Sequence, residues 1–125
     1  MLSSFSLNDF YYTFPTNRIL ILDCCPSPYI SPVAPDSSPG DEFGGSISLY
    51  EDTLVVGARY DDDIGTDSGS AHIFVRTGET WNWVSKLLAP EGETEDYFAF
   101  STGMYNGTVA VGSMSGEIHV YSDYK

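Results

Sequence analysis

Short stretches in which apolar and polar residues alternate follow one another after residue 40, a pattern typical of β-strands. Residues 46–50 and 53–58 are predicted to form a hairpin, with Glu51 and Asp52 in its turn. Turn-forming residues bound each stretch, and no run with a helical period interrupts them. The pattern therefore predicts an all-β fold.

Two further strands are predicted to complete a four-stranded antiparallel sheet. Residues 71–76 alternate, so that Ala71 and Ile73 face one side and His72 faces the other. A turn at residues 77–79 leads to a fourth strand over roughly 81–88. We expect strand 53–58 to pair antiparallel with strand 71–76. The residues expected to be buried are Leu54, Val56, Ala71, Ile73 and Val109.

The same order of elements recurs later in the chain. The aligned segments are 41–50 with 96–105, 53–58 with 108–113, and 69–74 with 116–121. The second copy lacks the intervening loop, and its hairpin turn is Asn106-Gly107, a strong hairpin signal. Four antiparallel strands make one blade of a β-propeller, and the length of the repeat suits such a blade. The repeat therefore predicts propeller-type blades.

The two copies resemble the FG-GAP repeat of integrin α-type β-propellers. The name-giving pairs are Phe43-Gly44 and Gly57-Ala58. In the second copy, Ala99 and Ser113 replace the usual Gly and Ala. The resemblance implies adhesion or ligand binding and, in some blades, calcium binding. Because the chain holds about one and a half repeats, it implies an open, incomplete propeller that is a fragment of a longer one.

Composition divides the chain near residue 40, because most prolines precede this point and nearly all glycines follow it. Residues 1–40 are expected to be a Pro-rich irregular segment or linker, partly polyproline II over 25–35. A strand is a candidate only at 18–22. The first repeat then covers residues 41–95, and the second, truncated repeat covers residues 96–125.

Charge and hydropathy exclude several classes of partner. The net charge is −13, from 18 acidic and five basic residues, so the chain repels nucleic acid and anionic lipid. No apolar run reaches the ~18 residues of a membrane span, and no membrane insertion is expected. The N-terminus lacks the pattern of a signal peptide. Adjacent Cys24 and Cys25 cannot provide a disulfide framework.

An acidic loop follows the strand at 53–58 and is a candidate calcium site through Asp61, Asp63 and Asp67. Its carboxylates alternate, but the central position is Gly65, which has no side chain to offer an ion. The calcium loop of the family would precede strand 53–58, where this chain has only a tight turn. The alternative, a solvated acidic turn, is favoured, so neither tight calcium binding nor another cofactor is expected.

Asp67-Ser68-Gly69 matches the D-S-G triplet of aspartic proteases, whose catalytic unit is a pair of aspartates that share a proton. Apolar strand residues precede the aspartate in those enzymes, whereas Gly65 and Thr66 precede it here. The internal repeat also explains the triplet without catalysis. A protease is therefore a remote alternative, and no catalytic residue is assigned.

Three other features have both a functional and a structural explanation. His72 and His119 occupy matched positions and could form a metal pair, but half-exposed positions on the blade surface are favoured. Trp81 and Trp83 lie on one face of a strand, where packing is favoured over sugar binding. Asn106 begins a glycosylation sequon that also serves as the hairpin turn.

The sequence thus favours a non-catalytic interaction or structural module of a cell-surface or secreted protein. Its location rests on the family resemblance alone. The alternative is an accessory repeat domain of a larger hydrolase whose catalytic part lies outside these residues. The expected partners are adjacent blades of a longer chain or an extracellular ligand. Self-association through open sheet edges is also expected of an isolated chain.

Overall fold

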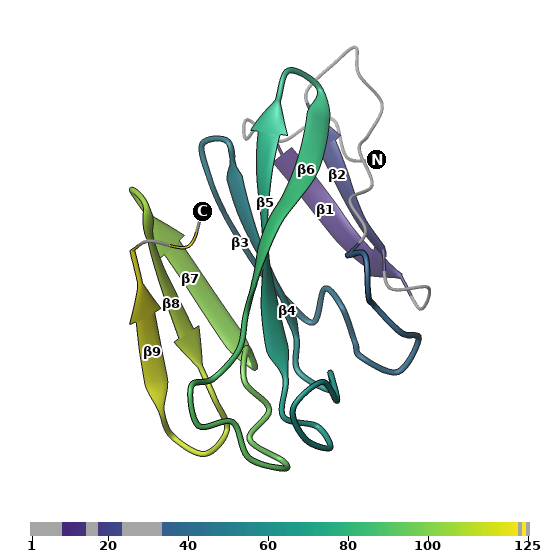
Figure 1. Ribbon diagram of the computed structural model, residues 1–125. Helices are drawn as coiled ribbons and strands as arrows, with labels where there is room; N and C mark the ends of the chain where they lie inside the picture. Colours follow the sequence, from purple (N-terminus) through teal and green to yellow (C-terminus); the bar gives the residue numbers. More distant parts are fainter. Residues whose placement is uncertain (1–8, 15–17, 24–33, 123, 125) are drawn as a thin grey trace.

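The computed structural model describes residues 9–14, 18–23, 34–122 and 124, and all its regular elements are β-strands (Figure 1). The strands are β1 (Asp9–Phe14), β2 (Arg18–Asp23), β3 (Ser46–Tyr50), β4 (Thr53–Ala58), β5 (Ser70–Thr77), β6 (Thr80–Leu87), β7 (Ser101–Tyr105), β8 (Thr108–Gly112) and β9 (Ile118–Tyr121). The all-β prediction is confirmed. The described residues include no helix of the length and apolarity needed to cross a membrane.

The first repeat forms a four-stranded antiparallel sheet in the order β3-β4-β5-β6. Tyr50 pairs with Thr53 across the predicted two-residue turn, where Glu51 takes a positive φ of 52°. Strand β4 pairs antiparallel with β5, as predicted, with Val55 opposite Ile73. The register between β5 and β6 shifts at Ile73/Phe74.

The second repeat forms a separate three-stranded sheet in the order β7-β8-β9. Its first turn is Asn106-Gly107, with φ values of 45° and 82°, the paired positive values of a type I′ hairpin. In Figure 1 this sheet stands beside the first, with β7 next to β3 and β4. The two sheets are open and do not close into a ring, as predicted for an incomplete propeller.

Two strands lie within the N-terminal region, of which only the one near residues 18–22 was a candidate from the sequence. Strands β1 and β2 form a two-stranded antiparallel sheet of their own, with Phe10 opposite Leu22. The candidate strand at 18–22 is β2, and its run of Ile and Leu has the β propensity that pairing requires. The predicted proline linker and both cysteines fall almost entirely in residues 24–33, outside the described residues.

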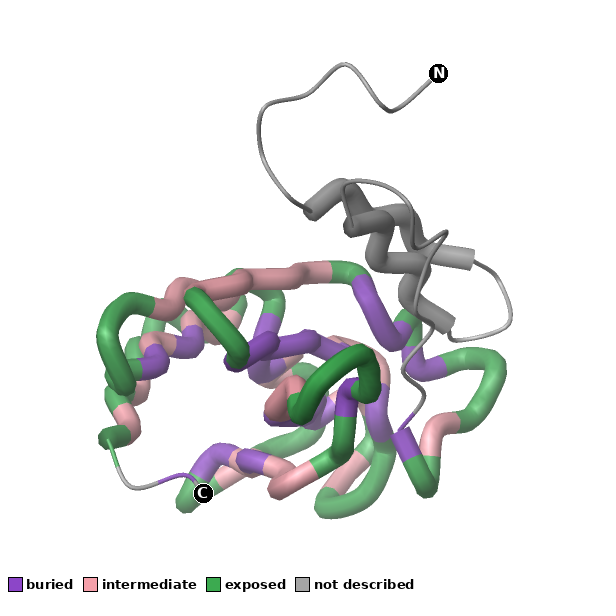
Figure 2. Tube along the Cα trace, turned by 90° about the horizontal axis from the view of Figure 1, so that it is seen from above, coloured by how far each residue is buried: buried purple, intermediate pink, exposed green. Residues whose placement is uncertain are grey.

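Buried side chains form two hydrophobic clusters, and Figure 2 shows the buried positions as purple stretches along the chain. One cluster fills the space between the sheets, where Val55 and Ile73 of the first sheet meet Val109 and Val111 of the second. The other covers the opposite face of the first sheet and includes Phe74. The five residues predicted to be buried are all at most 1% exposed. Both faces of the first sheet are therefore covered.

A close backbone contact joins the acidic loop to the start of the second repeat. Phe98 N donates to Ser68 O at 2.8 Å, and Gly69 forms a parallel bridge with Phe98. Gly69 has a φ of 86°, and a Cβ placed there would lie 2.2 Å from Phe98 O. Only glycine satisfies both the backbone angle and the close approach at this junction.

Replacing Gly69 by alanine is expected to destabilise the fold by about 2 kcal/mol, because positive φ and a backbone clash are combined. Gly78→Ala is the matched control, since its φ is 64° but nothing lies within 4 Å of its added Cβ. Urea unfolding of the two variants measures the difference. Equal losses of stability in Gly69→Ala and Gly78→Ala would show that the backbone around Phe98 moves to accommodate the added methyl group without a free-energy cost.

Candidate functional site

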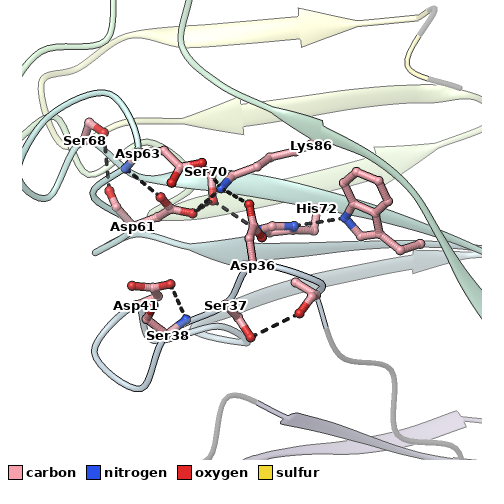
Figure 3. A network of polar contacts seen from close by, with 12 residues as sticks. Asp36, Ser37, Ser38, Asp41, Asp61, Asp63, Ser68, Ser70, His72 and Lys86 are labelled. Carbon is pink, nitrogen blue, oxygen red and sulfur yellow. Dashed lines mark hydrogen bonds and ion pairs between the residues drawn. The ribbon is translucent and has the colours of Figure 1, made fainter.

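A cluster of buried and half-buried polar side chains lies on the face of the first sheet that points away from the second sheet (Figure 3). At its centre is Lys86, on β6. The Lys86 Nζ atom lies 2.7 Å from Asp61 Oδ2 and 2.8 Å from Asp36 Oδ2, and it also contacts the Asp63 carboxylate. Asp61 is only 4% exposed in its side chain and Lys86 only 11%. The ammonium group thus holds three carboxylates from distant parts of the chain.

The network continues from Asp61 into the sheet through hydrogen bonds whose direction can be assigned. Trp83 Nε1 donates to His72 Nδ1 at 3.2 Å, so the imidazole proton is on Nε2. His72 Nε2 then donates to Ser70 Oγ at 3.1 Å, and Ser70 Oγ donates to Asp61 Oδ2 at 2.7 Å. The chain of donors ends at a carboxylate already neutralised by Lys86.

The electrostatics of the site follow from burial and from these bonds. Burial lowers the pKa of His72 to about 4, and the nearby charge of Lys86 adds to this effect. Burial alone would raise the pKa of Asp61, but hydrogen bonds from Lys86 and Ser70 outweigh it and lower that pKa. Burial likewise opposes the charge of Lys86, but its three carboxylate partners raise its pKa above the usual value.

A half-exposed position for His72 was wrong, because the residue is 1% exposed. Strand alternation places it opposite Ile73, but both faces of this sheet are covered. Its ring meets Phe43 edge-on, with centroids 5.4 Å apart. His119 makes the corresponding contact with Phe98 at 5.5 Å, with the rings tilted, and is half-buried. The two histidines lie on different sheets and contact different aromatic rings.

The candidate calcium residues do not converge on one point. Asp61 and Asp63 face Lys86, and the Asp61 carboxylate also accepts from Asp63 N at 2.9 Å. Asp67 is a turn residue with a φ of 54°, and its backbone N donates to Asp62 Oδ1. Among the described residues, no group of three or more His, Cys, Asp or Glu is arranged to hold a metal ion.

We expect no tight calcium binding by this loop, because the Lys86 ammonium occupies the space between its carboxylates and a divalent cation would have to displace it. Isothermal calorimetry of the full chain should show no saturable heat in the micromolar range of calcium. Asp63→Ala is the comparison variant. Micromolar affinity that disappears in Asp63→Ala would contradict this prediction.

The D-S-G triplet and the Asp61-Ser70-His72 cluster both lack the geometry of a catalytic site. The second copy lacks the loop that contains Asp67, so it supplies no partner for an aspartic dyad. The Ser70 hydroxyl is fully buried and donates its proton to a carboxylate. A nucleophilic serine instead donates to its histidine and faces substrate.

Two other candidates are separated by the structure. Trp81 is 7% exposed and packs in the cluster with Phe74, whereas Trp83 is 40% exposed and is held by its bond to His72. With Trp81 in the core, the two rings do not form a shared exposed platform. Asn106 is exposed in the turn between β7 and β8, a position accessible to a modifying enzyme.

Lys86, Asp36 and Ser70 are members of the cluster that were not predicted from the sequence. A signal was present for Lys86, since a lysine in an amphipathic strand of a chain with only five basic residues needs a counter-ion. Nothing in the local pattern indicated which carboxylates would provide it. Asp36 belongs to the segment before β3, 50 residues from Lys86, and contacts across such a distance do not follow from periodicity.

Comparison with known proteins agrees with the internal repeat. The family model described as FG-GAP repeat matches residues 33–74, which include β3 and β4 and most of the polar cluster. No curated protein matches the chain significantly. The second sheet is related to the matched segment through the internal alignment, and both sheets share the contact between the repeat's Phe and His. Residues 33–74 of this chain are thus identified as a match to the FG-GAP repeat.

Proposed function

We propose that this chain is a non-catalytic interaction or structural module of the β-propeller type, belonging to a cell-surface or secreted protein. The observation that carries the proposal is the packing of two repeated sheets against each other, with Val55 and Ile73 against Val109 and Val111. Repeat units that bury their faces against neighbours build extended surfaces for binding.

The polar cluster supports a structural role for the first repeat. Consecutive hydrogen bonds run from Trp83 through His72 and Ser70 to Asp61. The Lys86 ammonium neutralises the Asp61 carboxylate at the end of this series. Fully satisfied buried networks fix a single arrangement of the surrounding elements. Here the network joins strands β5 and β6 to the acidic loop and to Asp36 in the segment before β3.

The acidic surface supports an extracellular setting. A net charge of −13 keeps such a module soluble and away from nucleic acid and anionic membranes. The exposed sequon at Asn106 would accept a glycan in a secretory pathway.

Immunodetection in intact and permeabilised source cells tests the proposal. We expect signal on intact cells or in the medium, and a mobility shift after glycosidase treatment that Asn106→Gln removes. A protein detected only after permeabilisation would contradict a surface or secreted role. The Asn106 variant serves as the control for the mobility shift.

A further inference from the structure

Alternate residues of the β7-β8 hairpin point away from the first sheet. Met104 and Val109 pair across this hairpin, and both contribute to the hydrophobic cluster between the two sheets. Because successive strand residues point to opposite faces, their neighbours lie on the outer face, which is the face of the β7-β8-β9 sheet away from the first sheet. The outer face of the hairpin therefore carries two cross-strand pairs, Gly103 with Ala110 and Tyr105 with Thr108.

The outer face is hollowed beside the hairpin turn. The hollow has a volume of about 410 Å³, within the range of about 300–1,000 Å³ that is typical of small-ligand pockets. It is open above Gly103, because a Cβ added there would have no atom within 4 Å. Tyr105, at its border, is 70% exposed. The lining residues are Gly103, Met104, Tyr105, Asn106, Thr108 and Ala110.

Two members of a glycosylation sequon border this hollow. The sequon is Asn106-Gly107-Thr108, the only one in the sequence, and it directly follows Tyr105. The type I′ turn pairs Tyr105 with Thr108, so it brings an aromatic ring, the acceptor amide and a hydroxyl to one end of the hairpin. A sugar attached to Asn106 is therefore tethered at the rim of the hollow.

The first repeat has the corresponding hairpin but neither the sequon nor the space. Its turn is Glu51-Asp52, which offers no acceptor asparagine. The aligned positions of the two small residues in the hollow are occupied there by Ser48 and Val55, and Val55 is fully buried. The acceptor asparagine and the open space beside it thus occur together, in the second repeat alone.

The chemistry of a pyranose ring suits the hollow. Its C–H groups form an apolar face that packs on the electron-rich face of an aromatic ring, and its hydroxyl groups stay in solvent. The covalent tether removes most of the entropy cost that a separate ligand would meet on binding. The sugar is also uncharged, so the net charge of −13 does not oppose it, as it would oppose a second copy of the chain.

We propose that the first sugar of an N-linked glycan on Asn106 packs in this hollow against the Tyr105 ring and stabilises the second sheet. In the attachment step, the bond between C1 of the sugar and a lipid-linked pyrophosphate breaks and a bond from Asn106 Nδ2 to C1 forms. One amide proton leaves with the pyrophosphate. The inference rests on the proposed function, because this transfer takes place in a secretory pathway.

The test compares two forms of the full chain that differ by one sugar. One form is secreted from eukaryotic cells behind a cleavable signal and is trimmed by an endoglycosidase that leaves a single N-acetylglucosamine on the asparagine. The other form has the same sequence and comes from a bacterial host that adds no N-linked glycan. We expect the form with the sugar to have a Tm roughly 4 °C higher.

Tyr105→Ala tests whether the aromatic ring is the contact. This variant should lower the Tm of both forms, because Tyr105 also meets Tyr50 with ring centroids 4.9 Å apart. The readout is therefore the difference in Tm between the two forms of each variant, which should fall close to zero in Tyr105→Ala. Tyr50→Ala is the matched control, since it loses the same ring contact but leaves Tyr105 at the hollow, and it should keep the difference.

Gly103→Val tests the hollow independently of the aromatic ring. Gly103 lies within β7, where a valine side chain meets no neighbouring atom and suits the strand. The variant should therefore fold, fill the hollow and lose the rise in Tm that the sugar gives to wild type.

Equal Tm values for the two wild-type forms would overturn the inference, as would a rise that both Tyr105→Ala and Gly103→Val retain. A chain that is secreted and folded without a sugar on Asn106 would overturn it as well. Detection on intact source cells decides the proposed function and does not depend on these melting temperatures, so each can fail or hold separately.

Discussion

Replacing Lys86 by methionine will lower the free energy of unfolding by about 3–5 kcal/mol, because breaking a buried ion pair leaves an uncompensated charge. Methionine keeps the apolar stem and removes only the ammonium. Asp61, with 4% of its side chain exposed, then loses the partner 2.7 Å away that holds it ionised. Asp36 and Asp63 are about half exposed and regain solvation, so Asp61 dominates the loss. Equilibrium unfolding in urea at pH 7 measures it.

Arg59→Met is the matched control for the loss of a cation. Arg59 pairs with Glu42 at 2.8 Å, but the side chains are 31% and 48% exposed, and such pairs contribute about 0–1 kcal/mol. Adding Asp61→Asn to Lys86→Met should recover part of the stability, because the neutral amide no longer requires a counter-ion. A Lys86→Met variant as stable as Arg59→Met would show that the ammonium contributes little.

Much of the fold could be predicted from sequence because its determinants are local. Alternation placed β4 and β5, and Asn106-Gly107 placed the turn between β7 and β8. The internal repeat then transferred each element from the first copy to the second. Within a single hairpin, the alternation of apolar and polar residues gives the positions of the strands, and the turn residues give the position of the turn.

The polar cluster could not be predicted because its members are remote in sequence. Alternation showed that His72 lies opposite Ile73, but it did not show that both faces of the sheet are covered. Ala34, from the segment before β3, is part of that cover and is 3% exposed. Lys86 and Asp36 meet only because β6 returns beside β5. Contacts of this kind depend on tertiary packing rather than on local pattern.

The assignment of the acidic loop changes for the same reason. The sequence offered a choice between a calcium site and a solvated turn, and Gly65 at the central position favoured the turn. The structure shows that the loop is not simply solvated, because Asp61 is buried and bonded to Ser70 and Lys86. Two of its carboxylates, Asp61 and Asp63, form ion pairs with the Lys86 ammonium instead of binding a metal cation.

Acidification from pH 7 to pH 4 is expected to remove about 3 kcal/mol of stability through His72 alone, at about 1.4 kcal/mol for each unit of its lowered pKa. The folded-state pKa is about 4, against an ordinary value of 6.5. Above pH 6.5 both states hold a neutral ring and the full stability is present. As the pH falls through 6.5, His72 becomes protonated in the unfolded chain, whereas in the folded chain it stays neutral until about pH 4.

The geometry is consistent with the lowered pKa of His72, because a proton on His72 Nδ1 would face the Trp83 Nε1–H group that now donates a hydrogen bond to this atom. Asp61, whose pKa is lowered, loses its contribution only at more acidic pH, and Asp41, whose pKa is raised by burial, acts with the opposite sign. Urea unfolding at several pH values between 7 and 4 should therefore show a steep decline in wild type and a shallow one in His72→Gln. His119→Gln, altered at the matched half-buried position, should keep the steep decline. Parallel declines in wild type and His72→Gln would mean that another group controls acid unfolding, and that the chain of bonds from Trp83 to Asp61 tolerates a charged imidazole.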